Sequence, residues 1–379
     1  MISVVVNILI VVLILGFLIT IHELGHFMAA KLFKVKVEAF AIGLGPKIFG
    51  KKIGETEYRL NVFPLGGYVK ILGEGDEERD KKEEKDPGNF KNKSKIAQVI
   101  ILLAGITMNL VFALVIYYGF IISFSYKWAL GEDIRDFEPV VGTVEVEKVG
   151  KVKYDGLVEE SGADKAGLPK NGEIMRVDGK ELVYSYEFRD YVSKRPNENV
   201  IIDICNTECK DYSVNISKEG KAGIYVASNY IIFLDYSRDK VISGVGHALN
   251  LFKLMGEKLG SLFSEAKQTG DYSPIANNIS GPIGIYLIVE AFKQYGFLSL
   301  LGLTADLSFT LMIMNILPIP ALDGGRVMLI ILESIFGKYW NRKVEIWAIN
   351  ISFVFLLLLM VAIVFKDIIF FDDIRKLLR

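Results

Sequence analysis

The sequence predicts a polytopic α-helical membrane protein with four transmembrane helices, a membrane-associated β-sheet and one folded domain outside the membrane. Of the 379 residues, 51% are hydrophobic and only 23% are charged, and the mean hydropathy is +0.34. This composition is too apolar for an ordinary soluble enzyme. The apolar residues are concentrated in four blocks, each long enough to cross a bilayer. The segment between the second and third blocks is long enough to fold separately.

The charge balance and the cysteine count exclude several classes of protein. Lysine and arginine total 44 against 45 acidic residues, a net charge of −1, so nothing indicates a nucleic-acid partner. Two cysteines argue against a disulfide scaffold, an iron–sulfur protein or a cysteine-rich zinc fold. Cys205 and Cys209 flank a plausible hairpin loop. A cross-strand disulfide and a reduced structural pair both remain open.

The four apolar blocks also predict how the chain crosses the membrane. The predicted helical regions are 1–33, 96–126, 282–336 and 343–367. Pro318 and Pro320 break the third region. Lysines lie on both sides of the connection between the first two helices, so this connection should face the cytoplasm. We therefore expect a multi-pass protein of the cell inner (plasma) membrane, with its folded domain extracytoplasmic.

The segments between the helices have patterns of their own. Residues 34–75 contain strand-like runs separated by glycines, which predicts a small β-sheet. Its apolar tip is expected to pack against the protein's own helices. Residues 76–95 are a charged linker. Residues 137–228 contain short β-branched runs, among them Val140 to Val146, and an apparent helix from Ser185 to Lys194. Residues 241–268 predict an amphipathic helix that lies on the membrane surface or packs on the folded domain.

One motif at the end of the first helix can support chemistry. In His22-Glu23-Leu24-Gly25-His26 the two histidines lie one helical turn apart on the same face, so both can bind one zinc ion. Zinc would lower the pKa of a bound water toward about 7, and Glu23 would take its proton and deliver it to a leaving amine. The motif also occurs in soluble helices without a metal. At the end of a bilayer span, however, these side chains are costly unless they function.

A catalytic zinc needs a third protein ligand and an open position. His247 lies on the predicted amphipathic helix, away from the motif. The carboxylates of the third region are Asp306 and Asp323. Asp323 follows the helix-breaking prolines, and a loop of that kind inside a membrane must line a cavity or be buried in protein. Asp323 is therefore the favoured ligand, and Asp306 is the weaker candidate, expected to partner a polar group or a water.

Together, HExxH at the end of the first helix and Asn-x-x-Pro-x-Pro-x-Leu-Asp-Gly in the third resemble the site-2 protease family of intramembrane zinc metalloproteases. Residues 156–181 look like a bacterial PDZ domain, so the chain resembles the regulator of sigma-E protease group with a single PDZ domain. The motif Gly281-Pro282-Ile283-Gly284 resembles a further family motif. The resemblance assigns roles to nine residues. They are the Zn²⁺ ligands His22, His26 and Asp323, the base Glu23, and the substrate-binding residues Asn315, Pro318, Gly43, Gly45 and Tyr68.

The expected function is an intramembrane zinc endopeptidase that cleaves transmembrane segments of single-span membrane proteins in regulated intramembrane proteolysis. The substrate would be an anti-sigma factor or a signal-peptide remnant, cut toward the cytoplasmic side, with a peptide as a possible ligand of the PDZ domain. A proton- or ion-coupled transporter using the same His/Glu/Asp cluster is the alternative, although no internal repeat favours it. A catalytically silent scaffold is a third possibility, and Glu23 disfavours it. Asn315 could also simply cap the broken helix.

Overall fold

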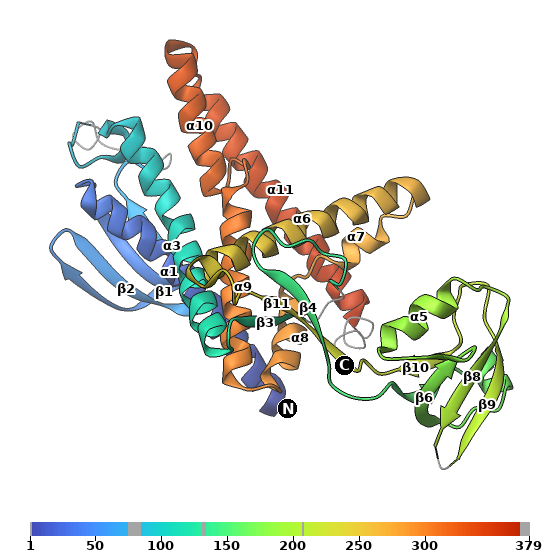
Figure 1. The fold of residues 1–379 in the computed structure, drawn as a ribbon. Helices are drawn as coiled ribbons and strands as arrows, with labels where there is room; N and C mark the ends of the chain where they lie inside the picture. Colours follow the sequence, from blue (N-terminus) through green and yellow to red (C-terminus); the bar gives the residue numbers. More distant parts are fainter. Residues whose placement is uncertain (1, 75–84, 131–133, 207, 372–379) are drawn as a thin grey trace. The chain divides into compact units, whose positions relative to one another are not determined.

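The computed structural model describes residues 2–74, 85–130, 134–206 and 208–371 (Figure 1). Most of the predicted charged linker, residues 75–84, lies outside this part. The chain divides into two compact units, one made of residues 1–120 and 255–379 and the other of residues 121–254. Within the described residues, four helices are long and apolar enough to cross a membrane, which confirms the predicted number. They are Val4–Leu32, Lys95–Ser123, Phe297–Ile316 and Arg342–Ile369.

The helices of the first unit follow the uninterrupted apolar runs of the sequence. They are α1 (Ile2–Leu32), α3 (Lys95–Ser123), α7 (Ser273–Asn277), α8 (Pro282–Lys293), α9 (Phe297–Ile316), α10 (Asp323–Phe336) and α11 (Arg342–Ile369), with short 3₁₀ turns at Phe90–Asn92 and Gly337–Tyr339. The predicted third region, 282–336, is divided twice. The prolines end α9 as expected, but a second break at Gly296, where φ is +91°, separates α8 from α9. The sequence analysis missed this second break.

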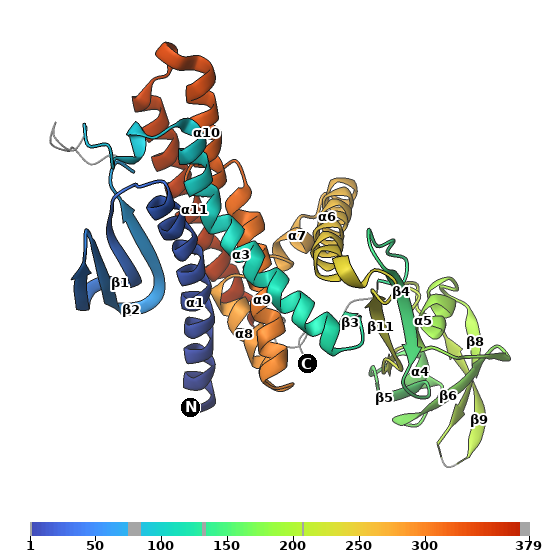
Figure 2. The ribbon, with the colours of Figure 1, turned by 60° about the vertical axis from the view of Figure 1, so that its left-hand side comes forward.

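Strands β1 (Val37–Ile53) and β2 (Thr56–Ile71) form an antiparallel sheet with an unusual register. Residues 37–42 pair with residues 67–71 on one side and with residues 57–60 on the other. The chain can bend back in this way because Gly43 and Gly45 have φ values of +85° and +88°, a region that favours glycine. As a result, residues 67–71 form an outer edge of the sheet. Figure 2 shows the sheet lying alongside α1.

Among the described residues, two buried clusters stabilise the first unit. One lies where the sheet meets α1 and α3, and its least exposed members are Ala30, Val37 and Ile101. The other joins α1, α8 and α9 near the N-terminus. The Gly281-Pro282-Ile283-Gly284 motif begins α8, and the buried Asp367 of α11 accepts hydrogen bonds from the N–H groups of Gly281 (3.0 Å) and Gly284 (2.9 Å). This motif therefore anchors one helix end to another.

The second unit contains two sheets. The larger has the strand order β10-β5-β6-β8-β9, with β7 paired to β6, and the smaller has the order β3-β11-β4. The strands are β3 (Lys127–Leu130), β4 (Thr143–Lys148), β5 (Lys153–Leu157), β6 (Asn171–Val177), β7 (Lys180–Glu181), β8 (Asn199–Cys205), β9 (Cys209–Asn215), β10 (Ile224–Val226) and β11 (Tyr230–Asp235). The expected strand Val140 to Val146 begins later, at Thr143, and pairs with β11. It therefore belongs to the smaller sheet, not to the larger one.

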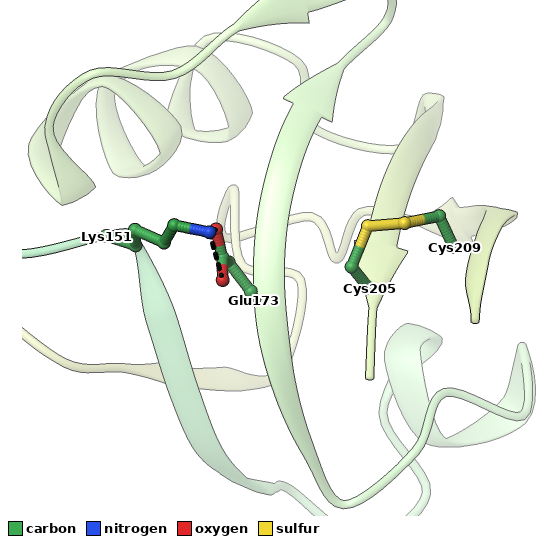
Figure 3. Close-up of a disulfide and its surroundings, with 4 residues drawn as sticks. All are labelled: Lys151, Glu173, Cys205 and Cys209. Carbon is green, nitrogen blue, oxygen red and sulfur yellow. Dashed lines mark hydrogen bonds and ion pairs between the residues drawn. A yellow bond between two sulfur atoms is a disulfide. The ribbon is translucent and has the colours of Figure 1, made fainter. Parts of the chain in front are cut away.

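Two short helices and a disulfide also belong to this unit. Helix α4 (Gly162–Lys165) and helix α5 (Ser185–Ser193) contribute to the core of the larger sheet, and α5 matches the predicted helix within one residue. Cys205 and Cys209 face each other across the β8–β9 hairpin and form a disulfide, so the oxidised alternative is the one observed (Figure 3). In the same view Lys151 pairs with Glu173 of β6 at 2.8 Å.

Helix α6 (Ser243–Thr269) covers the predicted amphipathic segment and begins in the second unit after a 3₁₀ turn at Lys240–Ile242. Its first turns bury His247, Ala248 and Asn250, whereas Leu249 and Phe252 are exposed. Leu249 and Phe252 of the predicted apolar face therefore remain exposed, and the buried polar side chains of His247 and Asn250 both contact Tyr236 of the second unit.

Candidate metal centre

The HExxH motif lies within the unbroken helix α1. His22 and His26 are both buried, each with 8% of its surface exposed. Their rings meet edge to face with centroids 4.7 Å apart, and their Nε2 atoms are 3.1 Å apart. The helix thus presents two imidazole nitrogens at one point, as the spacing of the motif predicted.

Asp323 is the first residue of α10, and two glycines after it allow this helix to begin close to the end of α9. A Cβ atom at Gly324 would lie 2.3 Å from the carbonyl oxygen of Ile316, and one at Gly325 would lie 1.9 Å from that of Ile319. The close approach places Oδ2 of Asp323 at 2.9 Å from Nε2 of His22 and 3.4 Å from Nε2 of His26.

Asp306 lies elsewhere in the unit, where it accepts a hydrogen bond of 2.9 Å from the hydroxyl of Tyr117. It has the polar partner that the sequence analysis expected for it. Of the two aspartates considered, the structure brings Asp323 to the histidines.

The three side chains fit a zinc ion. Their ligand atoms are separated by 2.9, 3.1 and 3.4 Å, and a tetrahedron with zinc–ligand bonds of about 2.0–2.1 Å has edges of about 3.4 Å. Two imidazoles and one carboxylate are a donor set used by catalytic zinc sites, and three protein ligands leave the fourth position open for water or substrate. In the described part of the chain, His22, His26 and Asp323 are the side chains whose ligand atoms lie close enough together to hold a metal ion.

Helix α3 closes the far side of this group. The carbonyl oxygen of Ile101 lies 2.9 Å from Nδ1 of His26. One turn later, a Cβ atom at Gly105 would lie 2.4 Å from Nε2 of His26 and 2.8 Å from Cε1 of His22. The sequence analysis did not identify Gly105. The available signal was a glycine inside a long apolar helix, where it costs stability relative to alanine unless another element approaches closely.

A cavity of 390 Å³ opens beside the three side chains. Glu23 lies in its wall, and its Oε2 accepts a hydrogen bond of 3.0 Å from the backbone N–H of Val69. Tyr68 also lies in the wall, and its hydroxyl accepts a hydrogen bond of 3.3 Å from Arg59. The residues that line the cavity are His22, Glu23, His26, Tyr68, Val69, Lys70, Ile71, Glu74, Asp323 and Arg326.

Four of the predicted substrate-binding residues are not among those that line this cavity within the described structure. Gly43 and Gly45 lie at the bend of β1. Asn315 lies in the last turn of α9, and Pro318 lies in the loop between α9 and α10. The C-terminal end of α9 is capped by the backbone, because the N–H of Leu317 donates a hydrogen bond to the carbonyl oxygen of Met314.

An ion pair that the sequence analysis did not anticipate joins two walls of the cavity. Arg326 of α10 pairs with Glu74, which follows the end of β2. Arg326 lies three residues after Asp323. Its ion pair with Glu74 therefore connects α10, which carries Asp323, to β2, which contacts Glu23. No local pattern could have shown this, because the two partners lie far apart in the sequence.

Comparisons with known proteins agree with this geometry. Residues 10–359 match peptidase family M50. A protein of Clostridium acetobutylicum is 32% identical over 365 residues, covering 96% of this chain and 98% of the relative. A protein of Clostridium perfringens is 31% identical over 358 residues, with 93% and 96% covered. One of Helicobacter pylori is 30% identical over 376 residues, with 98% and 99% covered.

Each of these three relatives carries the name "Putative zinc metalloprotease". The family match spans nearly the whole chain, including the HExxH motif on α1 and Asp323 on α10. The chain therefore belongs to peptidase family M50, the site-2 protease family, and is a zinc metallopeptidase.

Proposed function

We propose that this protein is an intramembrane endopeptidase in which His22, His26 and Asp323 bind zinc and Glu23 is the general base. The observation that carries the proposal is the convergence of these side chains, from α1 and α10, on one wall of a 390 Å³ cavity. Helix α1, which carries both histidines, is long and apolar enough to cross a bilayer. The transporter alternative would use the same side chains, but membership of a peptidase family disfavours it.

The roles of the chain's own groups follow from their positions. Bound zinc supplies Lewis acidity, which lowers the pKa of water and polarises a carbonyl group. The carboxylate of Glu23 lines the same cavity, where it takes a proton from the attacking water and returns it to the leaving amine. The N–H of Val69, at 3.0 Å, holds one oxygen of that carboxylate, which leaves the other free for proton transfer.

We propose that the substrate is the transmembrane segment of a single-span membrane protein, bound in an extended form. A helix hides its peptide bonds, so a transmembrane segment must unwind before it is cut. The stretch from Tyr68 to Ile71 lines the cavity and forms an outer edge of the sheet. Such an edge can pair with any extended backbone, which makes binding tolerant of sequence. An anti-sigma factor or a signal-peptide remnant, cleaved in regulated intramembrane proteolysis, fits this requirement.

The second unit is proposed to be an extracytoplasmic PDZ domain that binds a peptide. Its antiparallel sheet, two short helices and buried core support this proposal. The Cys205–Cys209 disulfide supports the extracytoplasmic side, because disulfides persist in oxidising compartments. Gly43, Gly45, Asn315 and Pro318 remain proposed substrate contacts beyond the cavity wall.

The catalytic role of Glu23 can be tested on the full-length protein purified in detergent. We expect Glu23→Gln to retain one zinc per chain and to cleave a model single-span substrate at least about 100-fold more slowly, because the amide cannot accept the proton. Metal analysis and a gel-based cleavage assay measure both. Glu55→Gln, at the exposed turn between β1 and β2 and outside the cavity wall, is the control and should cleave normally. Wild-type cleavage by the Gln variant would remove Glu23 from the mechanism.

The ligand set is tested separately through the third ligand. We expect Asp323→Ala to lose zinc to a chelator faster than the wild type, because only two imidazoles remain to hold the ion. Asp306→Ala, which removes the other aspartate considered, should retain zinc as the wild type does. Unchanged zinc retention in Asp323→Ala would assign the third ligand to another residue.

A further inference from the structure

Helix α3 presents one face to the two histidines, at intervals of four residues. The carbonyl oxygen of Ile101 lies 2.9 Å from Nδ1 of His26. Gly105 faces both rings. Asn109 continues the row, and its Nδ2 lies 3.4 Å from Nδ1 of His22. Residues four apart on a helix lie on the same side, so each histidine has its own polar group on this face.

The chemistry of a metal-bound imidazole determines what these polar groups must do. When Nε2 directs its lone pair at a metal, the neutral ring carries its proton on Nδ1 and needs an acceptor there. Ile101 supplies a carbonyl oxygen to His26. For His22, the side chain in the matching position is Asn109, which is fully buried. An amide contains both a donor and an acceptor, so its orientation decides whether it can serve.

The amide oxygen of Asn109 has no hydrogen-bond partner within the described residues. Rotating the amide by 180° about its last bond exchanges Oδ1 and Nδ2 without moving other atoms. The exchange replaces a donor that faces the Nδ1 proton of His22 with an acceptor. In either orientation, one of the two amide atoms faces His22 and the other has no hydrogen-bond partner within the described residues. The two orientations therefore differ only in the hydrogen bond to His22, and this bond selects the one with the oxygen toward Nδ1.

We propose that Asn109 is a positioning residue of the metal centre. Its amide oxygen accepts the Nδ1 proton of His22, which fixes the tautomer and directs Nε2 toward zinc. The inference rests on the proposed ligand set. A hydrogen bond of 2.9 Å from the hydroxyl of Ser308 on α9 to the backbone oxygen of Asn109 holds this part of α3 in place. The Ser308 contact involves the backbone and leaves the amide of Asn109 available to His22.

Zinc release from full-length protein in detergent tests the inference. Asn109→Leu has similar size but no acceptor, and we expect zinc to pass to a chromophoric chelator about 10- to 100-fold faster. Asn109→Asp keeps an oxygen acceptor and should stay within about threefold of the wild type. Thr107→Ala, on the exposed face of α3, is the control for a change in the same helix and should also stay within that range. In cobalt-substituted protein, the Leu variant should show a changed visible spectrum and the Asp variant should not.

The outcomes separate this inference from the proposed ligands. Full zinc retention in His22→Ala would overturn the ligand set itself. Loss of zinc in His22→Ala together with wild-type release from Asn109→Leu would overturn only the role of Asn109. Equally fast release from the Leu and Asp variants would also overturn it, because packing rather than an acceptor would then be responsible. If Asn109→Leu does not elute as a folded protein, Asn109→Ala replaces it, and wild-type release from that smaller variant overturns the inference.

Discussion

At the scale of single residues, the proposed metal centre includes groups that touch the proposed ligands without binding the metal. Ile101 and Asn109 face the outer nitrogens of the two histidines, and Gly105 allows α3 to come close to both rings. Partners of this kind orient metal ligands and contribute to affinity. The sequence motif predicts two of the proposed ligands, but the backbone and side-chain groups that face their outer nitrogens come from a different helix.

The close contact at Gly105 leads to a prediction. We expect Gly105→Ala to lower zinc affinity at least about 10-fold, because its Cβ would lie 2.4 Å from Nε2 of His26 and would displace a ligand. Competition with a chelator of known affinity measures the change. Gly119→Ala on the same helix is the control, since a Cβ there meets nothing within 4 Å. Equal zinc affinities for the two variants would show that the rings can move aside at no cost.

The residues of HExxH could be predicted because their relationship is local. A helix places residues 22 and 26 on one side whatever surrounds it. The roles of Gly105 and Asn109 could not be predicted in this way. A glycine and an asparagine within an apolar helix have many explanations, and only the packing of α3 against α1 selects one.

At the scale of elements, the packing of α6 on the small sheet buries a histidine among polar groups. His247 is fully buried, its Nδ1 lies 2.9 Å from the hydroxyl of Tyr236, and its ring lies against Trp128 with centroids 4.3 Å apart. Asn250, one turn further along α6, donates to the same hydroxyl. Burial lowers the pKa of His247 to about 3, because the charged imidazolium is poorly solvated there.

This burial predicts a pH dependence of stability. In the unfolded chain, histidine has a pKa of about 6.5 and therefore binds a proton below that pH. In the folded unit, His247 does not bind a proton until the pH falls to about 3. The stabilisation is complete above pH 6.5 and decreases as the pH falls. We expect a loss of about 2 kcal/mol at pH 5 relative to pH 8. Hydrogen exchange of the β11 amides, corrected for intrinsic rates, measures it.

The matched variant for this experiment is His247→Gln, which keeps a polar side chain but cannot titrate. Its β11 amides should exchange with much less difference between pH 5 and pH 8 than those of the wild type. The same pH response in both proteins would assign the effect to other groups.

The β-sheet shows what local patterns can and cannot predict about an element. The run Tyr68 to Leu72 predicted a strand, and residues 67–71 pair with β1 as part of β2. Its place at the outer edge, facing the cavity, depends on the bends at Gly43 and Gly45 and on the long-range pairing with residues 37–42. A strand pattern does not specify which neighbour it pairs with.

At the scale of the whole molecule, the positive-inside rule predicts an orientation that the disulfide makes easy to test. Both natural cysteines are paired, so a thiol reagent reports on an introduced cysteine alone. In intact cells we expect a membrane-impermeant maleimide to label Lys218→Cys, on the exposed surface of the second unit, and not Lys343→Cys, at the start of α11. Lysis should make the second variant reactive. The opposite labelling pattern would reverse the proposed topology.

The sequence by itself determined the four apolar helices, the HExxH motif and the helix break before Asp323, because each depends on neighbours within a few turns of chain. Only the tertiary structure decided that Asp323 rather than Asp306 meets the histidines. It also decided that Val69 contacts Glu23 and that one face of α3 lies behind both imidazole rings. These contacts join residues far apart in the chain, and their geometry depends on how helices and strands pack, which no local pattern specifies.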